Sequence, residues 1–184
     1  MKNKAIFLDR DGTINVDVGY AHKIEDLEII PKVVEGLKLL QEEYKLIIVT
    51  NQSGIGRGHY TEEDYHVFQL ALRQKLNKQG IFLTGEYFCP HHPEKGIGKY
   101  KIDCNCRKPK TGMLEQASND FNIDLTNSWM IGDHLNDLQV GKRAGCKTIY
   151  ILTGHQHGEE LNSSADFIAK NMKKAADYIL NHTK

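Results

Sequence analysis

The sequence predicts an α/β fold in which a single doubly wound (Rossmann-like), mainly parallel sheet carries helices on both faces. Short apolar runs alternate with helix-like patterns along the whole chain, as in successive βα units. The length of 184 residues suits a single domain spanning residues 1–184. No insertion is long enough to form a large cap domain over the sheet.

The expected elements follow in chain order. Apolar and β-branched runs predict strands at residues 5–8, 45–50, 128–131 and 147–152, a short edge strand at 166–168, and a third strand at either 81–83 or 87–88. Apolar residues recurring at helical spacing predict helices at residues 31–40, 61–79, 113–121, 135–144 and 172–180. Pro31 suits a helix start, Thr61 suits an N-cap, and Gly80 and Gly145 suit helix ends.

Charge and composition exclude several classes of partner. Lys and Arg together number 24, as do Asp and Glu, so no net charge favours nucleic acid or an anionic membrane. No apolar run approaches the roughly 20 residues that span a bilayer. The N-terminus enters a strand at once, without the apolar core of a signal peptide. We therefore expect a cytoplasmic protein that is a monomer and has no nucleic-acid or membrane partner.

Two aspartates stand at the end of the first strand. Asp9 and Asp11 are two residues apart, and strand alternation would aim both side chains the same way. Two like charges so close are unfavourable unless a cation lies between them, and a divalent metal held by both is the simplest solution. The alternative is a polar turn with both carboxylates in solvent.

Polar clusters follow three of the predicted strands, at residues 9–13, 50–54 and 132–137. In open α/β sheets, ligands bind outside the carboxyl ends of the strands, so this convergence predicts one site. Thr50 and Asn51 offer hydrogen-bond donors, and the glycines of residues 54–58 would let the backbone approach an anion. A flexible loop is the alternative interpretation of that glycine-rich stretch.

Three cysteines and a histidine cluster in a segment with few apolar residues. Cys89, His91, Cys104 and Cys106 form two pairs, each separated by one residue, and these ligands suit tetrahedral Zn²⁺. Four protein ligands leave no open position, so the ion would be structural and would stabilise this loop. His92 could replace His91, and buried cysteines that merely pack are the alternative. Such an ion would also position Arg107 and Lys108, which follow Cys106.

The motifs resemble those of a known family. Residues 7–14, residues 49–54, the run Arg107-Lys108-Pro109-Lys110 and the Gly132-Asp133-x-x-x-Asp137 pattern resemble the four motifs of the haloacid dehalogenase phosphohydrolase superfamily. With Cys-Pro-His-His-Pro at 89–93 and Cys-x-Cys-Arg-Lys-Pro at 104–109, the chain resembles the histidinol-phosphate phosphatase subfamily.

The resemblance implies an Mg²⁺-dependent phosphatase that works through an aspartyl-phosphate. It implies that Asp9 is the nucleophile and Asp11 the general acid and base, while Thr50 binds the phosphoryl group and Lys108 screens its charge. It assigns Mg²⁺ to Asp9, Asp11 and Asp133, and it gives Asp137 a supporting role in which it does not bind the ion itself.

The resemblance also implies the substrate contacts. They are Asp17, Val18, Gly19, Tyr20, Asn51, Gln52, Ser53, Arg107 and His134, the last at a position where relatives carry lysine. A small-molecule sugar bisphosphate is the expected substrate, and histidinol phosphate or a nucleic-acid end is the alternative. A different kind of function, a zinc-stabilised binding module without catalysis, is also possible. The presence of the aspartates and the lysine of all four motifs argues against it. His155 and His157 are expected in a surface loop.

Overall fold

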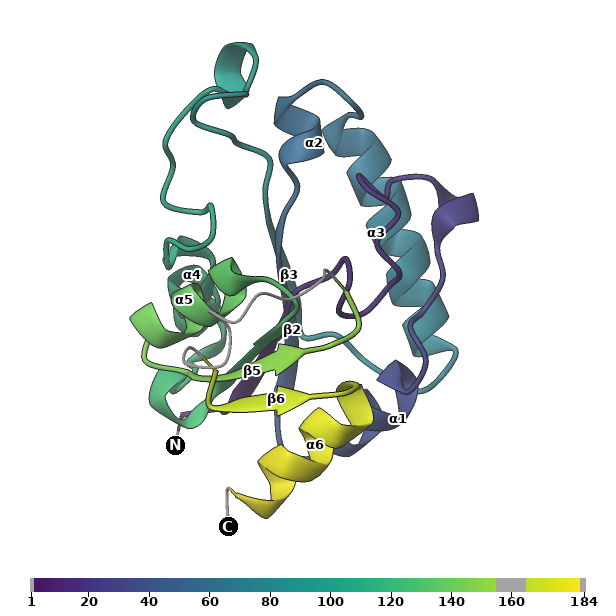
Figure 1. The fold of residues 1–184 in the computed structure, drawn as a ribbon, viewed down its shortest axis with the longest axis vertical. Helices are drawn as coiled ribbons and strands as arrows, with labels where there is room; N and C mark the ends of the chain where they lie inside the picture. The colour runs from purple at the N-terminus through teal and green to yellow at the C-terminus, as the bar shows by residue number, and fades with distance from the viewer. Residues whose placement is uncertain (1, 155–164, 183–184) are drawn as a thin grey trace.

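The structure, a computed structural model, describes residues 2–154 and 165–182. Its centre is a parallel sheet with the strand order β3-β2-β1-β4-β5-β6 (Figure 1). The strands are β1 (Ala5–Leu8), β2 (Lys45–Asn51), β3 (Gly85–Cys89), β4 (Trp129–Gly132), β5 (Lys147–Ile151) and β6 (Phe167–Ala169). The doubly wound parallel sheet predicted from the sequence is confirmed.

Helices cover both faces of this sheet. The α-helices are α1 (Val33–Leu40), α2 (Ser53–Gly56), α3 (Glu62–Asn77), α4 (Gly112–Phe121), α5 (Leu135–Arg143) and α6 (Met172–Asn181). Short 3-10 helices are η1 (Ile24–Asp26), η2 (Gly98–Tyr100) and η3 (Leu125–Asn127). The segment between β3 and α4 extends beyond the sheet and carries η2 at its tip (Figure 1).

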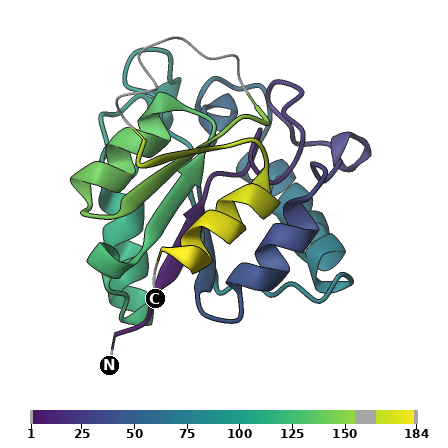
Figure 2. The ribbon, with the colours of Figure 1, turned by 60° about the horizontal axis from the view of Figure 1, so that its bottom comes forward.

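Alternation along the buried strands builds two cores. Ile6 and Leu8 of β1 pack in a cluster with residues of α1, α3 and α6, whereas Phe7 packs with residues of α4 and α5 on the other face. Helices α1 and α6 lie side by side on the first face (Figure 2). Because β1 is buried on both sides, its sequence is apolar at every position, as expected for a central parallel strand.

Several element boundaries differ from the sequence-based expectations. Helix α1 begins at Val33 rather than at Pro31, because Lys32 adopts a left-handed backbone with φ of 71°. The third strand is the later alternative, while Ile81 is buried in the core ahead of it. Helix α3 begins after Thr61 as predicted, and Thr61 and Asp64 form a capping box there. The short helix α2 was not predicted, since two of its four residues are glycine.

The strand order explains where a site can form. Strand β1 lies between β2 and β4, so the segments that follow these three strands meet at one edge. Within the described residues, no separate unit covers that edge, in agreement with the expectation of no large cap. The same part of the chain has no helix with the length and apolar character needed to cross a bilayer. His155 and His157 lie outside the described residues.

Candidate active site

The carboxyl ends of the central strands enclose a cavity of about 430 Å³. Thirteen of the predicted site residues line it, from all three strand ends and from the loop before α4. They are Asp9, Asp11, Asp17, Gly19, Tyr20, Thr50, Asn51, Gln52, Ser53, Arg107, Lys108, His134 and Asp137. The strand-end clusters therefore meet in one cavity, at the edge where open α/β sheets bind ligands.

A few residues differ from that expectation. Val18, predicted to contact substrate, is 53% exposed and is not among the residues that line the cavity. Gly54, expected to let the backbone approach an anion, lines the cavity as well, and Arg57, Tyr60 and Asn136 line it without having been predicted. Arg57 could have been found as the basic residue of the glycine-rich loop, whereas Tyr60 carries no signal in the sequence.

Asp9 directly follows β1 and is held firmly. Its backbone N–H donates to the carbonyl of Ile131 in β4 at 3.0 Å, and its Oδ1 accepts from Lys108 Nζ at 2.7 Å. Among the described residues, no donor reaches Oδ2. Burial raises the pKa of Asp9 from its ordinary value of 3.8 to about 6, although the Lys108 ammonium opposes the rise. One carboxylate oxygen is thus fixed and the other is available for chemistry.

Lys108 lies between two buried carboxylates. Its Nζ donates to Asp9 Oδ1 at 2.7 Å, to Asp137 Oδ1 at 2.6 Å and to the carbonyl of Val49 at 2.9 Å. These three bonds use all the donors of an ammonium group. Burial alone would lower the pKa of Lys108, but Asp137 and Asp9 raise it overall, so the side chain is charged. Lys108 therefore compensates the charge that gathers in the site.

Asn51 fixes the backbone of the lysine. Its Oδ1 accepts from the Lys108 N–H at 3.0 Å, and its Nδ2 donates to the Lys108 carbonyl at 3.1 Å. The last residue of β2 thereby anchors an irregular loop that is distant in the sequence. Asn51 was predicted as a substrate contact, and the structure also gives its amide this supporting role.

Asp133 lies in a narrow space beside Asp9. It accepts from Thr13 Oγ1 at 3.2 Å, and a side chain at Gly12 or Gly154 would collide with its carboxylate. Gly12 also has a φ of 78°, which favours glycine, so the turn after β1 can approach this acid closely.

Three carboxylates form a cluster that could hold a cation. Asp9, Asp133 and Asp137 each offer an oxygen within 4.8 Å of the others. Both oxygens of Asp137 already accept, one from Lys108 and the other from the His134 N–H at 3.0 Å. Carboxylate oxygens suit Mg²⁺, a hard cation that prefers oxygen ligands, and Asp9 and Asp133 are two of the predicted ligands that this cluster brings together. The contact to Lys108 suits the supporting role predicted for Asp137.

The carboxylate of Asp11 is not part of this cluster, contrary to the expectation that it shares a metal with Asp9. It accepts from Arg10 at 2.9 and 3.0 Å, from Asn15 Nδ2 at 2.9 Å and from Gln52 Nε2 at 2.9 Å. The physical reason is that β1 ends at Leu8 and the chain then turns, with the Ile14 N–H bonded to the Arg10 carbonyl at 2.8 Å. Strand alternation therefore no longer governs the direction of Asp11.

Gln52 and Thr50 form a buried pair at the end of β2. Gln52 Nε2 donates to Thr50 Oγ1 at 2.9 Å, so the Thr50 hydroxyl proton is left to donate elsewhere. Gln52 Oε1 accepts from Tyr60 Oη and from Arg10 Nη2. The amide of Gln52 is thus occupied on both sides by the protein itself, although the residue was predicted as a substrate contact.

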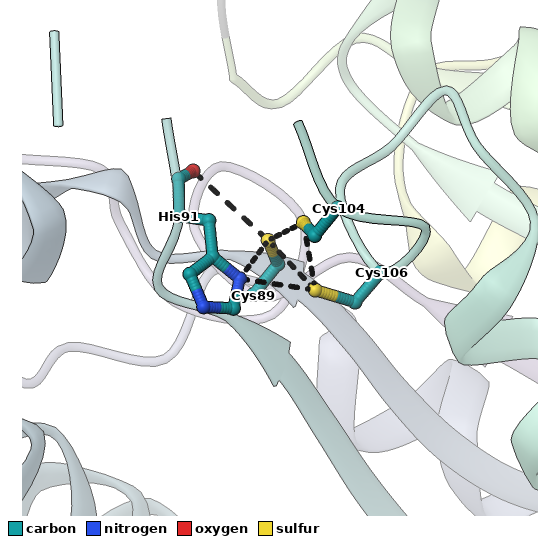
Figure 3. Close-up of side chains that lie close together, drawn as sticks. All are labelled: Cys89, His91, Cys104 and Cys106. Carbon is teal, nitrogen blue, oxygen red and sulfur yellow. Dashed lines mark hydrogen bonds between the residues drawn. The ribbon is translucent and has the colours of Figure 1, made fainter. Parts of the chain in front are cut away.

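The cysteine cluster converges at the end of β3 (Figure 3). The three sulfurs of Cys89, Cys104 and Cys106 lie 3.0 to 3.4 Å apart, and His91 Nδ1 lies 3.4 Å from Cys106 Sγ and 3.8 Å from Cys89 Sγ. Zn–S bonds of 2.3 Å would give a tetrahedron with edges of about 3.8 Å, close to this spacing. The four ligand types and their spacing fit a structural zinc ion.

The contacts around the cysteine cluster show which histidine faces the sulfurs and how the cluster meets the cavity. His91, not His92, points toward the sulfurs, since His92 Nδ1 accepts from the Glu94 and Lys95 N–H groups at 3.3 and 3.1 Å. Arg107 Nη1 donates to the His91 carbonyl at 3.1 Å, so the cluster directly contacts a residue of the cavity. Cys146 is buried in the core and belongs to neither site.

The fold and the site together define a class of protein. The HAD-hydrolase-like family matches residues 105–175, which include Lys108, Asp133 and Asp137. A phosphatase of D,D-heptose 1,7-bisphosphate from B. bronchiseptica, solved in complex with magnesium and phosphate, superposes with a TM-score of 0.82 at 26% identity, covering 97% of this chain and 98% of its own. The molecule is a HAD-like hydrolase.

Sequence relatives narrow the class. A D-glycero-beta-D-manno-heptose-1,7-bisphosphate 7-phosphatase from Haemophilus ducreyi is 43% identical over 97% of this chain and 100% of its own length. One from Vibrio cholerae is 41% identical over all of both chains, and a phosphatase for the alpha anomer from Photorhabdus laumondii is 42% identical over 86% of this chain and 87% of its own. The chain belongs to the family of D-glycero-D-manno-heptose-1,7-bisphosphate 7-phosphatases.

Proposed function

We propose that this protein hydrolyses the 7-phosphate of D-glycero-D-manno-heptose 1,7-bisphosphate and releases heptose 1-phosphate, a precursor for lipopolysaccharide core or another glycan. The observation that carries the proposal is the buried Asp9–Lys108–Asp137 group, which lines the same cavity as Asp11 and Thr50. A nucleophile beside an acid serves bond cleavage, and binding alone has no need of it. The names of the relatives support the choice of substrate.

In the first step, Asp9 Oδ2 attacks phosphorus in line with the sugar oxygen. The P–O bond to the sugar breaks as the new bond forms, and Asp11 gives a proton to the departing oxygen. The Thr50 hydroxyl donates to the phosphoryl oxygens, and the Lys108 ammonium offsets their charge. The products of this step are the free sugar hydroxyl and a phosphorylated Asp9.

In the second step, water replaces the protein at phosphorus. Asp11, now ionised, takes a proton from the water as its oxygen attacks, and the bond between phosphorus and Asp9 breaks. Inorganic phosphate leaves, and both aspartates return to their starting forms. Asp9 and Asp133 would hold Mg²⁺, which would supply positive charge that offsets the charge of the phosphoryl oxygens.

Two guanidinium groups suit the phosphate that is retained. Arg57 and Arg107 both line the cavity, and so does His134. Arginine binds phosphate through two parallel N–H donors, which gives orientation as well as affinity. A second phosphate at the far end of the substrate would therefore be recognised, and this favours a bisphosphate over histidinol phosphate.

A substrate comparison tests this proposal. We expect kcat/KM for the heptose bisphosphate to exceed that for histidinol phosphate by at least about 10²-fold, because the analogue lacks the group that the guanidiniums bind. Phosphate release should be measured for the alpha and beta anomers of the 1,7-bisphosphate, for histidinol phosphate and for a 3′-phosphorylated oligonucleotide. Equal or better turnover of histidinol phosphate would contradict the assignment of the substrate.

We further propose that Cys89, His91, Cys104 and Cys106 bind one structural Zn²⁺. The ligand spacing supports the ion, and the surrounding loop buries few apolar side chains that could order it otherwise. Through the Arg107 contact to the His91 carbonyl, the ion would also position a residue that binds the substrate. Zinc binding and the shape of the cavity are thereby coupled.

Removal of a zinc ligand is the test. Cys104→Ala should lose the zinc, lower the melting temperature and raise KM for the bisphosphate, because the loop that carries Arg107 loses its anchor. Cys146→Ala is the matched control, since Cys146 is the remaining cysteine and is not one of the four clustered ligands, although it packs in the same apolar core as Cys89. Metal analysis by mass spectrometry should find about one zinc per chain in the wild type and in the control. Zinc content equal in Cys104→Ala would refute the site.

The other expectations drawn from the sequence stay predictions. These are a single domain over residues 1–184, a monomeric state, a cytoplasmic location and the lack of a nucleic-acid partner. Sedimentation of the purified protein would test the monomeric state directly.

A further inference from the structure

Arg10 is a charged side chain buried without solvent exposure, directly between the two aspartates of the first motif. Its Nε donates to Asp11 Oδ1 at 3.0 Å and its Nη2 to Asp11 Oδ2 at 2.9 Å. Two parallel bonds of this kind fix both the position and the plane of a carboxylate. A surface arginine next to an aspartate would not hold it in this way.

The guanidinium is itself held from several sides. Nη2 also donates to the Ala21 carbonyl at 2.8 Å and to Gln52 Oε1 at 3.2 Å. Its Cζ lies 4.6 Å from the ring centre of Phe68 and 5.4 Å from that of Tyr65, both on α3. Aromatic faces favour a planar cation there. The guanidinium therefore has one well-defined place in the fold.

Gln52 completes the arrangement around Asp11. Its Nε2 reaches Asp11 Oδ2 at 2.9 Å and Thr50 Oγ1 at 2.9 Å, while its Oε1 accepts from Arg10 and Tyr60. Arg10 and Gln52 thus contact each other and the same carboxylate. They also join two segments of the proposed site, Thr50 near the end of β2 and the loop of residues 17–22.

We propose that Arg10, together with Gln52, is a positioning residue that fixes the orientation of Asp11 for proton transfer and ties it to the loop of residues 17–22. The proposal rests on the proposed function, in which Asp11 gives a proton to the sugar oxygen and later takes one from water. Arg10, Asn15 and Gln52 fill the four acceptor positions of the carboxylate, so the bond from Asn15 or Gln52 opens when Asp11 carries the proton, while the paired contact to Arg10 holds its orientation. It assigns no chemical step to Arg10, whose guanidinium keeps its protons throughout.

A misplaced acid has a specific kinetic signature. A poor leaving group depends on protonation as the P–O bond breaks, whereas a good leaving group departs without it. The ratio of kcat/KM for p-nitrophenyl phosphate to that for phenyl phosphate measures this dependence. The two esters are alike in size, so altered recognition of the sugar cancels in the ratio. A lower fraction of folded protein also cancels.

Arg10→Lys is the first variant, because it keeps the charge but cannot form the paired contact together with the bonds to Ala21 and Gln52. We expect its ratio to rise by about tenfold or more over that of the wild type. Arg73→Lys is the matched control, since Arg73 is exposed on α3 and its side chain pairs with Glu86 of β3, away from Asp11. Its ratio should equal that of the wild type.

Gln52→Leu is the second variant. It removes the Gln52 bond to Asp11 without removing a buried charge, so it tests the proposal even if Arg10→Lys does not fold. An unchanged ratio in the variants that fold, as judged by circular dichroism, would overturn the proposal. If the wild-type enzyme hydrolysed no phosphate ester at all, the proposed function would fail instead, and the two failures are therefore distinct.

Discussion

Asp9→Asn is expected to abolish phosphatase activity, with kcat reduced by at least about 10⁴-fold. An amide cannot attack phosphorus as a carboxylate does, so the covalent intermediate does not form. Release of inorganic phosphate and labelling of the protein by ³²P-substrate in an acid-quenched reaction are the measurements. Asn is close in size to Asp and can still accept from Lys108 Nζ, so the fold should persist. Retained turnover, or retained labelling, would contradict the role of Asp9.

The same variant should be at least as stable as the wild type when metal is removed with EDTA. The folded-state pKa of Asp9 is raised from 3.8 to about 6, so the folded protein holds this proton more tightly than the unfolded chain. The protonated Asp9 carboxyl therefore adds to the free energy of unfolding below about pH 4. This contribution is lost as the pH rises to about 6. Melting temperatures across this range should therefore fall less in Asp9→Asn than in the wild type.

Lys108→Met is expected to have the second large effect, on stability and activity together. It leaves Asp9 and Asp137 buried and facing each other without a cation. Loss of one partner from a buried ion pair costs about 3–5 kcal/mol, and loss of a group that stabilises the transition state costs about 10²–10³ in kcat. Urea denaturation and steady-state kinetics measure the two effects.

The controls for Lys108 come from the same loop. Lys110→Met removes an exposed lysine whose partner, Asp103, is also on the surface, and should change little. Combining Lys108→Met with Asp137→Asn removes one of the stranded charges, so stability should recover while activity does not. A Lys108→Met protein as stable as the wild type would show that Lys108 does not neutralise the two acids.

The sheet was predictable because its signals are local. Apolar runs such as that of β1 identify buried strands, and the Thr61 capping box fixes the start of α3 within one residue. The ambiguity of the third strand arose because Ile81 is as buried as a strand residue while lying outside any strand. Burial, which the sequence pattern reports, does not by itself distinguish a packed loop from an edge strand.

The side-chain contacts within the site were less predictable, since they depend on how loops turn after the strands. The sequence placed Asp9 and Asp11 on one face, yet the turn at Arg10 takes Asp11 to a different set of donors. Gln52 resembles a substrate contact in the sequence, but its neighbours Arg10 and Tyr60 come from other segments. Long-range contacts of this kind leave no periodic signal in a single sequence.

The loop of residues 17–22 is held through its main chain. Arg10 Nη2 bonds the Ala21 carbonyl, and His22 Nδ1 bonds the Tyr20 carbonyl at 2.7 Å. Every amino acid carries such a carbonyl, so these anchors do not depend on the side chains at positions 18 and 20. At position 20, where φ is 57°, Asn and Gly are the replacements that the backbone tolerates best. Replacement of Tyr20, whose side chain lines the cavity, should therefore change the shape offered to the sugar while the bond from Arg10 to the Ala21 carbonyl stays in place.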